Sequence, residues 1–238
     1  MRLFALLAWL ALCAPLHVLA LPFGRSPWPR WFLRGVARIA GARVRSVGPP
    51  LAPHTLVIAN HVSWLDIPLL GGLAGCAFVS KDDLRGHPVM HWLCVQNGTV
   101  FIDRSDKRGI SGQTEAMLRT LAGPRPLVLF PEGTVSDGGQ LLPFRPPLLS
   151  AFAPPPAGVI VRPVAIDYGR NAREFGWPRG ENGKANFLRL LGRRGRFDVC
   201  LHLLDALPPL ADRKQLARAA HDAVAAALAP SGIAPASL

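Results

Sequence analysis

Short apolar runs alternate with helical patterns through most of the chain beyond residue 50. Each run has the length and apolar character of a buried strand. The predicted strands lie at residues 55–59, 76–80, 99–102, 127–130, 159–166 and 197–204. The predicted helices include residues 67–73, 88–95, 112–121 and 213–228. Strands that alternate with helices predict an α/β fold, in which helices flank a layered sheet of largely parallel or mixed strands.

The N-terminus has a different pattern. Residues 3–21 are almost wholly apolar, and their length approaches the roughly 20 residues that a membrane-spanning helix requires. Arg2 and the small residues around Ala20 also fit a cleaved signal peptide. We expect a retained membrane anchor, which either spans the bilayer or dips into one leaflet because Pro15 interrupts the run.

Arginines recur every four residues in the next segment, at Arg30, Arg34 and Arg38, among apolar residues that include Trp28 and Trp31. This spacing predicts an amphipathic helix. Such a helix either lies in the headgroup region, with its arginines toward phosphate, or packs on the rest of the protein. The arginines favour the cytoplasmic side of a membrane for the part of the chain that follows residue 24.

Glycine and proline at residues 48–50 separate this N-terminal part from the remainder. We predict a hydrophobic anchor with an amphipathic interfacial helix in residues 1–47 and one catalytic domain in residues 48–238. A length of 238 residues fits one domain with an appendage. Residues 171–184 are rich in glycine and charge, which predicts an exposed loop.

Composition narrows the possible partners. Hydrophobic residues make up 50% of the chain, and the net charge is +12. A positive charge of this size attracts nucleic acid, anionic substrates or an anionic membrane surface. The basic residues do not alternate with aromatic ones as on a nucleic-acid-binding module, so we expect membrane lipid as a partner and no nucleic acid. The four cysteines are scattered, which argues against a disulfide framework or a zinc site and favours a reducing compartment.

The segment after the first predicted strand contains the first candidate chemistry. His61 follows the strand directly, and Asp66 follows five residues later. An imidazole that a carboxylate orients can take the proton from a hydroxyl nucleophile. The alternative is that Asp66 caps the next helix, with Pro68 in its first turn or with Ser63 as the partner in a variant capping box. One carboxylate can do both.

Three further segments follow in a fixed order. The four blocks are Asn60-His61 with Asp66, Gly98 with Phe101-Ile102-Asp103-Arg104, Phe130-Pro131-Glu132-Gly133-Thr134, and Val161-Arg162-Pro163-Val164. Together they resemble the glycerolipid acyltransferases that acylate 1-acylglycerol-3-phosphate (the PlsC type). Lys81, Leu84 and Pro88 also match positions that this family usually has. The resemblance covers roughly residues 50–205.

The resemblance implies a membrane-associated O-acyltransferase that moves a fatty acyl group from acyl-CoA or acyl-acyl-carrier protein to 1-acylglycerol-3-phosphate and forms phosphatidic acid. His61 would be the general base, and Asp66 would hold the other imidazole nitrogen. The expected partners are membrane lipid, a lysophospholipid acceptor and the acyl donor, with no metal or organic cofactor. The expected location is the cytoplasmic face of the inner (plasma) membrane.

Substrate-binding residues are expected in the second and third blocks. The planar guanidinium of Arg104 suits the phosphate of an acylglycerol phosphate. The resemblance assigns acceptor binding to Glu132, Gly133 and Thr134, where Glu132 would organise Arg104 or the loop. Lys81 joins this group on the resemblance alone.

Other functions remain open on the residues alone. They are the same chemistry on another lysolipid such as lyso-ornithine lipid, a lipid hydrolase, and a lipid-binding module without catalysis. No serine lies in a Gly-x-Ser-x-Gly elbow, which counts against the hydrolase. His87 and His91 have helical spacing but no third ligand near them, so we expect no metal site. Phe144-Arg145-Pro146-Pro147 departs from the Phe-Lys-x-Gly that the family often has, which leaves the contact with acceptor or carrier open.

Overall fold

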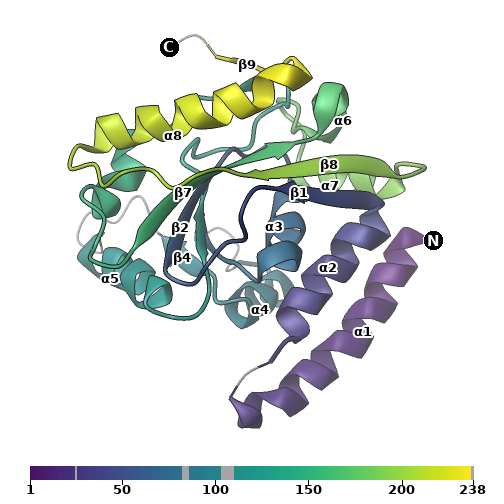
Figure 1. Cartoon of the computed structure of the whole chain (residues 1–238). Helices are drawn as coiled ribbons and strands as arrows, with labels where there is room; N and C mark the ends of the chain where they lie inside the picture. The colour runs from purple at the N-terminus through teal and green to yellow at the C-terminus, as the bar shows by residue number, and fades with distance from the viewer. Residues whose placement is uncertain (25, 82–85, 103–109, 237–238) are drawn as a thin grey trace.

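Figure 1 shows the computed structural model of the chain, in which helices cover a sheet and two N-terminal helices lie at one side. The structure describes residues 1–24, 26–81, 86–102 and 110–236. The strands are β1 (Ala42–Val47), β2 (Thr55–Ala59), β3 (Ala77–Lys81), β4 (Val100–Ile102), β5 (Leu127–Leu129), β6 (Gln140–Leu141), β7 (Ile160–Asp167), β8 (Phe197–Leu203) and β9 (Ala234–Pro235). The α-helices are α1 (Arg2–Ala20), α2 (Trp28–Ala40), α3 (Asp66–Ala74), α4 (Pro88–Gln96), α5 (Ile110–Leu121), α6 (Ala172–Phe175), α7 (Gly183–Gly192) and α8 (Arg213–Leu228). Short 3-10 turns are η1 (Leu21–Phe23), η3 (Pro146–Phe152), η4 (Gly169–Asn171) and η5 (Ala229–Ser231).

The main sheet has seven strands in the order β1-β8-β7-β2-β5-β3-β4. Strands β7, β2, β5, β3 and β4 are parallel, whereas β8 runs antiparallel to β7 and carries β1 parallel to itself. Strands β6 and β9 form a separate pair. The carboxyl ends of the five parallel strands therefore meet at one edge, which is where open α/β sheets bind ligands.

Strand β2 lies at the centre of the sheet and of the core. All five of its residues are buried, because it has a neighbouring strand on each side and helices on both faces. Helices α2 and α3 pack against each other on one face, and α8 packs on β7 and η3 on the other (Figure 1). An uninterrupted apolar run is what a central parallel strand requires.

The prediction of an α/β fold with helices around a layered sheet is confirmed. All six predicted strands and all four predicted helices are present, with bounds that agree or differ by one or two residues. The strands and α-helices that were not predicted from the sequence are β1, α6, α7, β6 and β9. The loop predicted at residues 171–184 is wrong in part, because α6 and the start of α7 lie within it and Phe175 is buried.

Helices α1 and α2 are held together by a tryptophan side chain of α1 that lies close to the backbone of α2. Helix α1 continues through Pro15 and packs along α2. A Cβ on Gly35 of α2 would lie 2.0 Å from the ring nitrogen of Trp9, and this nitrogen donates to the Phe32 carbonyl at 3.1 Å. Strand β1 joins the main sheet beside β8, so the sheet begins on the N-terminal side of the boundary placed after residue 47.

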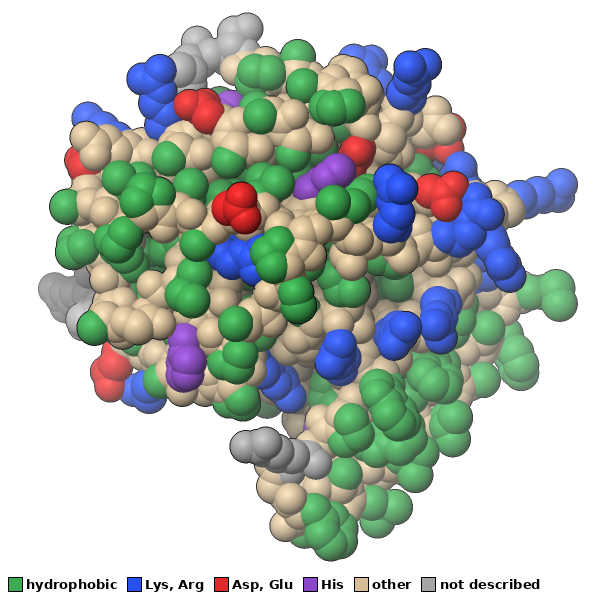
Figure 2. Space-filling model, viewed as in Figure 1, with side chains coloured by type: hydrophobic (Ala, Val, Ile, Leu, Met, Phe, Trp, Pro, Cys, Tyr) green, Lys and Arg blue, Asp and Glu red, His purple; other side chains and the backbone are tan. Residues whose placement is uncertain are grey.

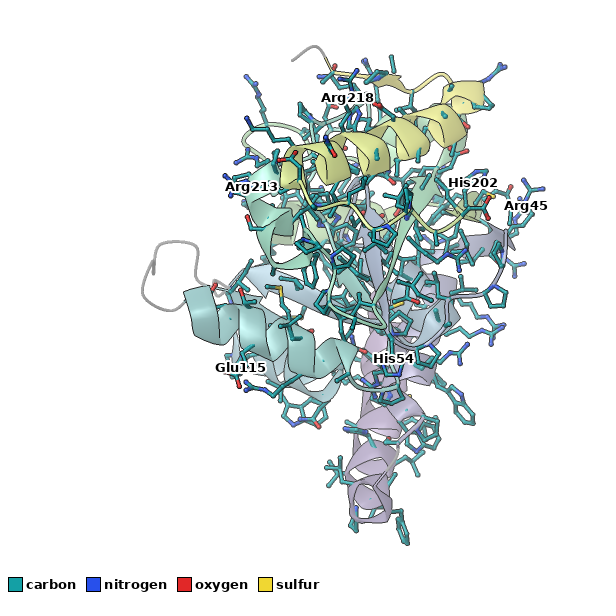
Figure 3. The ribbon with its side chains drawn as sticks, turned by 60° about the vertical axis from the view of Figure 1, so that its left-hand side comes forward. Arg45, His54, Glu115, His202, Arg213 and Arg218 are labelled. Carbon is teal, nitrogen blue, oxygen red and sulfur yellow. The ribbon has the colours of Figure 1, made fainter. Side chains whose placement is uncertain are left out.

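Large hydrophobic side chains are exposed along α1 and η1. They are Leu3, Phe4, Leu7, Leu12, Val18, Leu19, Leu21 and Phe23. Figure 2 shows hydrophobic side chains gathered over this part of the molecule, at the lower right, with Lys and Arg side chains beside them. In Figure 3 the same helices extend from the end of the molecule opposite α8, on which Arg213 and Arg218 are labelled. Residues Arg2–Phe23 are long and apolar enough to cross a membrane, a test that signal sequences also pass.

Candidate active site

Asn60 directly follows β2 and ties it to β7. Its side-chain amide donates to the Ile166 carbonyl at 3.0 Å, and its side-chain oxygen accepts from the Ile166 N–H at 2.8 Å. The side chain thereby replaces the next pair of backbone bonds between the strands. The chain leaves the sheet at this point, and His61 lies at the carboxyl edge.

His61 and Asp66 form a hydrogen-bonded pair at this edge. Nδ1 of His61 lies 2.8 Å from Oδ2 of Asp66. The same Oδ2 accepts from the backbone N–H groups of Val62 at 2.8 Å and Ser63 at 2.9 Å, while Oδ1 accepts from the Tyr168 hydroxyl at 2.5 Å. Asp66 is fully buried. Several donors around a carboxylate stabilise its ionised form, so the burial of this charge is compensated.

The turn between β2 and α3 decides between the two interpretations of Asp66. Helix α3 begins at Asp66 with Leu65 at the N-cap, so the prediction of Asp66 as the N-cap is wrong. The variant capping box with Ser63 is also wrong, because the N-cap, Leu65, makes no side-chain cap hydrogen bond and the Ser63 hydroxyl accepts from the Leu65 N–H. The Ser63 N–H still donates to the Asp66 carboxylate within the turn. The carboxylate thus stabilises the turn and holds the imidazole at the same time.

The imidazole of His61 is fixed on one face by Phe130. The two rings stack with centroids 4.1 Å apart and an interplanar angle of 14°. Because Nδ1 faces Asp66, Nε2 points away from the carboxylate, and it has no hydrogen-bond partner in the described part of the chain. The side chain is 17% exposed. Nε2 is therefore the atom that an incoming hydroxyl can reach.

The turn after β5 lies beside His61, since β5 runs parallel to β2 in the sheet. Oε1 of Glu132 accepts from the backbone N–H of His61 at 2.9 Å, and the Ser136 N–H donates to the His61 carbonyl at 2.8 Å. These bonds fix the third block against the first. Gly133 has a φ of 74°, and Thr134 is exposed at the same turn.

Glu132 is buried in a different electrostatic setting from Asp66. Burial raises the pKa of its carboxyl well above the usual value, the His61 N–H opposes this rise, and the charge of Asp66 adds to it. Its Oε2 is buried without a partner among residues 1–24, 26–81, 86–102 and 110–236. The two carboxyl groups of the site therefore differ in their surroundings, because Asp66 has several donors and Glu132 has a buried oxygen without one in the described part of the chain.

The structure does not describe the side chains of two predicted substrate-binding residues, Arg104 and Lys81. Arg104 lies outside the described residues, so its contact with a phosphate stays a prediction. Lys81 ends β3 at the carboxyl edge, where its backbone pairs with Ile102, and its side chain is outside the described part.

Arg162 of the fourth block is buried and has a structural role. Its guanidinium donates to four backbone carbonyls, those of Pro49, Pro50, Leu203 and Leu204. These bonds tie β7 to the end of β8 and to the segment that precedes β2. The fourth block therefore supports the sheet that carries the site.

The sequence analysis missed Tyr168, whose hydroxyl reaches Asp66. Tyr168 is 3% exposed and directly follows β7 at the carboxyl edge. It is the one tyrosine of the chain, and it stands two residues after a predicted strand. The signal in the sequence was a hydroxyl at the carboxyl end of a predicted strand, and only the structure shows that this strand lies next to β2.

No group of three or more potential His, Cys, Asp or Glu ligands occurs in the part of the chain that the structure describes. His91 instead lies with its ring 5.0 Å from that of Phe101.

Fold and site together define the class of protein, an α/β protein with a His–Asp pair at the carboxyl edge of a parallel sheet, equipped to activate a hydroxyl group. The sequence profile of the family described as "Acyltransferase" matches residues 43–167. The chain belongs to this acyltransferase family, and the protein is an acyltransferase.

Individual relatives differ in how much of the chain they match. The lyso-ornithine lipid O-acyltransferase of Pseudomonas aeruginosa is 39% identical over 213 residues, which are 86% of this chain and 79% of that protein. The 1-acyl-sn-glycerol-3-phosphate acyltransferase of Neisseria gonorrhoeae is 37% identical over 125 residues, 51% of this chain and 48% of that one. The crystal structure of the 1-acyl-sn-glycerophosphate acyltransferase PlsC of Thermotoga maritima matches with a TM-score of 0.62 at 23% identity, over 94% of this chain and 95% of that one. That structure supports the fold.

Proposed function

We propose that this acyltransferase moves a fatty acyl group from an acyl thioester, acyl-CoA or acyl-acyl-carrier protein, to the hydroxyl of a lysolipid. The observation that supports the proposal is the His61–Asp66 pair, in which Nε2 is open to a substrate. The names of the relatives supply the class of acceptor.

The reaction needs one base and no covalent enzyme intermediate. Nε2 of His61 takes the proton of the acceptor hydroxyl while its oxygen attacks the thioester carbonyl carbon. Asp66 holds the Nδ1–H and stabilises the imidazolium as it forms. When the tetrahedral intermediate collapses, the carbon–sulfur bond breaks and the proton passes from His61 to the leaving thiolate. The stack on Phe130 keeps the ring in one orientation through both steps.

The acceptor best supported by similarity is a lyso-ornithine lipid. The relatives of that name in Pseudomonas aeruginosa and Rhodobacter capsulatus match 86% and 84% of this chain. The second candidate is 1-acylglycerol-3-phosphate, which would give phosphatidic acid. It is favoured by the order of the four sequence blocks and by the relative in Neisseria gonorrhoeae, which matches 51% of the chain.

An acyl-transfer assay on membranes with the wild type or His61→Ala tests the proposal. It offers labelled acyl-CoA or acyl-acyl-carrier protein against lyso-ornithine lipid, 1-acylglycerol-3-phosphate and other lysolipids. We expect His61-dependent ornithine lipid, with a loss of at least about 10³-fold in His61→Ala. His61-dependent phosphatidic acid alone would move the assignment to the second acceptor. Free fatty acid without acceptor product would indicate a hydrolase, and equal activity of His61→Ala would overturn the mechanism.

We also place the protein at the membrane, on the cytoplasmic face. The exposed hydrophobic side chains of α1 and η1 form an apolar surface, and the exposed arginines of α2 follow it in the chain. The combined change of Phe4, Leu7 and Phe23 to Ser should release the protein from membranes washed with carbonate. Leu188→Ser, at an exposed hydrophobic position on α7, is the control and should leave the protein bound. Release of the wild type by the same wash would contradict this location.

A further inference from the structure

We propose that Tyr168 is a positioning residue of the active site, which holds Asp66 so that Oδ2 stays aimed at His61. The inference rests on the proposed role of His61 and deepens it.

The contacts of Asp66 divide unequally between its two oxygens. Oδ2 receives three donors, the His61 ring and the backbone N–H groups of Val62 and Ser63. Oδ1 receives the Tyr168 hydroxyl at 2.5 Å, and no other donor to it occurs in the described part of the chain. Because Asp66 is fully buried, bulk solvent does not reach its oxygens. The hydroxyl therefore balances the charge on the oxygen that faces away from His61.

The ring of Tyr168 is itself fixed by aromatic packing. It stacks on Phe175 with centroids 4.9 Å apart and an interplanar angle of 22°, and Phe175 packs on Phe197 at 4.4 Å. The guanidinium of Arg193 covers Phe175 at 5.0 Å from the ring centroid and pairs with Glu174. The Tyr168 ring thus packs against side chains from α6, β8 and the end of α7. This packing keeps its hydroxyl in one position beside Asp66.

The hydroxyl keeps its proton over the range in which an assay is run. Burial raises the pKa of Tyr168 well above its usual value, the charge of Asp66 adds to the rise, and the hydrogen bond with Asp66 adds further, whereas a bond with Ser63 opposes it. The ionisable groups around Asp66 in the described structure are His61, Tyr168 and Glu132. A change at Tyr168 therefore removes a neutral donor from Asp66 and adds no charge to the site.

Removal of the hydroxyl has a defined consequence. Without it, Oδ1 is an anionic oxygen in a dry site, so the carboxylate turns, gains a proton more easily, or holds the proton of the imidazolium more strongly. The first effect lowers kcat, and the other two move the acidic limb of the pH profile of kcat/KM to higher pH.

Tyr168→Phe removes the hydroxyl and keeps the ring stack. We expect kcat to fall about tenfold with an unchanged KM, and the acidic limb to move to higher pH. Ser231→Ala is the matched control. The Ser231 hydroxyl donates to Asp167 at 2.7 Å, and Asp167 precedes Tyr168 in the chain, but this bond does not involve Asp66. It should leave kcat and the pH profile as in the wild type.

A double-mutant cycle separates positioning from a general loss of stability. In the background of Asp66→Asn, Tyr168→Phe should cost less than about twofold in kcat, since the group that it holds is already changed. An equal tenfold loss in both backgrounds, or a wild-type kcat and pH profile for Tyr168→Phe, would overturn the inference. These outcomes leave His61→Ala inactive, whereas an active His61→Ala would remove the proposed function itself.

Discussion

The turns after β2 and β5 lie at the same sheet edge, and each buries a carboxyl group, Asp66 in the first and Glu132 in the second. The two carboxyl groups differ in how many donors surround them. After β2, Asp66 accepts from four donors, three in its own turn and the Tyr168 hydroxyl that follows β7. After β5, Glu132 accepts one hydrogen bond within the described part of the chain, from the His61 N–H, and the pKa of its carboxyl is raised well above the usual value. Both residues are almost completely buried, at 0% and 2% exposure. Local donors rather than burial therefore decide which carboxyl carries the charge.

The difference assigns separate tasks to two chemically similar groups. In the proposed mechanism, Asp66 holds the imidazole and stabilises its charged form. The carboxyl of Glu132 contacts the backbone of His61 and fixes the two turns against each other. Two ionised carboxylates this close would repel each other, so the raised pKa of Glu132 preserves the role of Asp66.

Asp66→Asn should give the largest effect within this comparison. The amide cannot accept from all the donors that surround the carboxylate, and it leaves His61 without an anionic partner. We expect kcat to fall by about 10³-fold and the free energy of unfolding by about 1–3 kcal/mol. Steady-state kinetics and urea unfolding measure the two changes. Asp167→Asn, which changes a carboxylate that contacts Gly169 and Ser231 but not His61, is the control; an equal loss of kcat there would show that the effect is not specific.

Glu132→Ala and Glu132→Gln test the role of the second carboxyl group, and we expect a smaller loss of activity than in Asp66→Asn. Glutamine keeps an oxygen that can accept from the His61 N–H, whereas alanine leaves this buried donor without a partner. We expect kcat/KM to fall about 100-fold in Glu132→Ala and less than about tenfold in Glu132→Gln. Equal losses in both variants would mean that the negative charge of Glu132 is required, which would remove the distinction between the two carboxyl groups.

The smallest expected effect is a pH dependence of stability. The pKa of Glu132 is raised in the folded state, so between the usual carboxyl value and the folded value the unfolded chain releases its proton first. The free energy of unfolding of the wild type should therefore decrease as pH rises through this range. Glu132→Gln lacks this term, so its stability relative to the wild type should increase with pH. Urea unfolding of both proteins at pH 5 and pH 8 measures the trend, and a constant difference would contradict it.

Local sequence predicted much of the fold and part of the site. The uninterrupted apolar runs of the central strands gave β2 and its neighbours, because a strand with helices on both faces needs no polar positions. Strand β1 was not predicted, because only its first residue, Ala42, is buried. Its alternation of arginine and valine is also compatible with an extended linker. His61 and Asp66 are five residues apart, and a turn of this length can bring two side chains together without help from the rest of the chain.

The sequence by itself therefore determined the six predicted strands, the acyltransferase blocks and the His61–Asp66 pair, since each depends on neighbours in the chain. Only the tertiary structure decided that Glu132 supports the backbone of His61 from 71 residues away and that Tyr168 reaches Asp66 from 102 residues away. Both contacts depend on β2 lying between β5 and β7 in the sheet. Strand order is set by how the whole core packs, and no local pattern of apolar and polar residues encodes it.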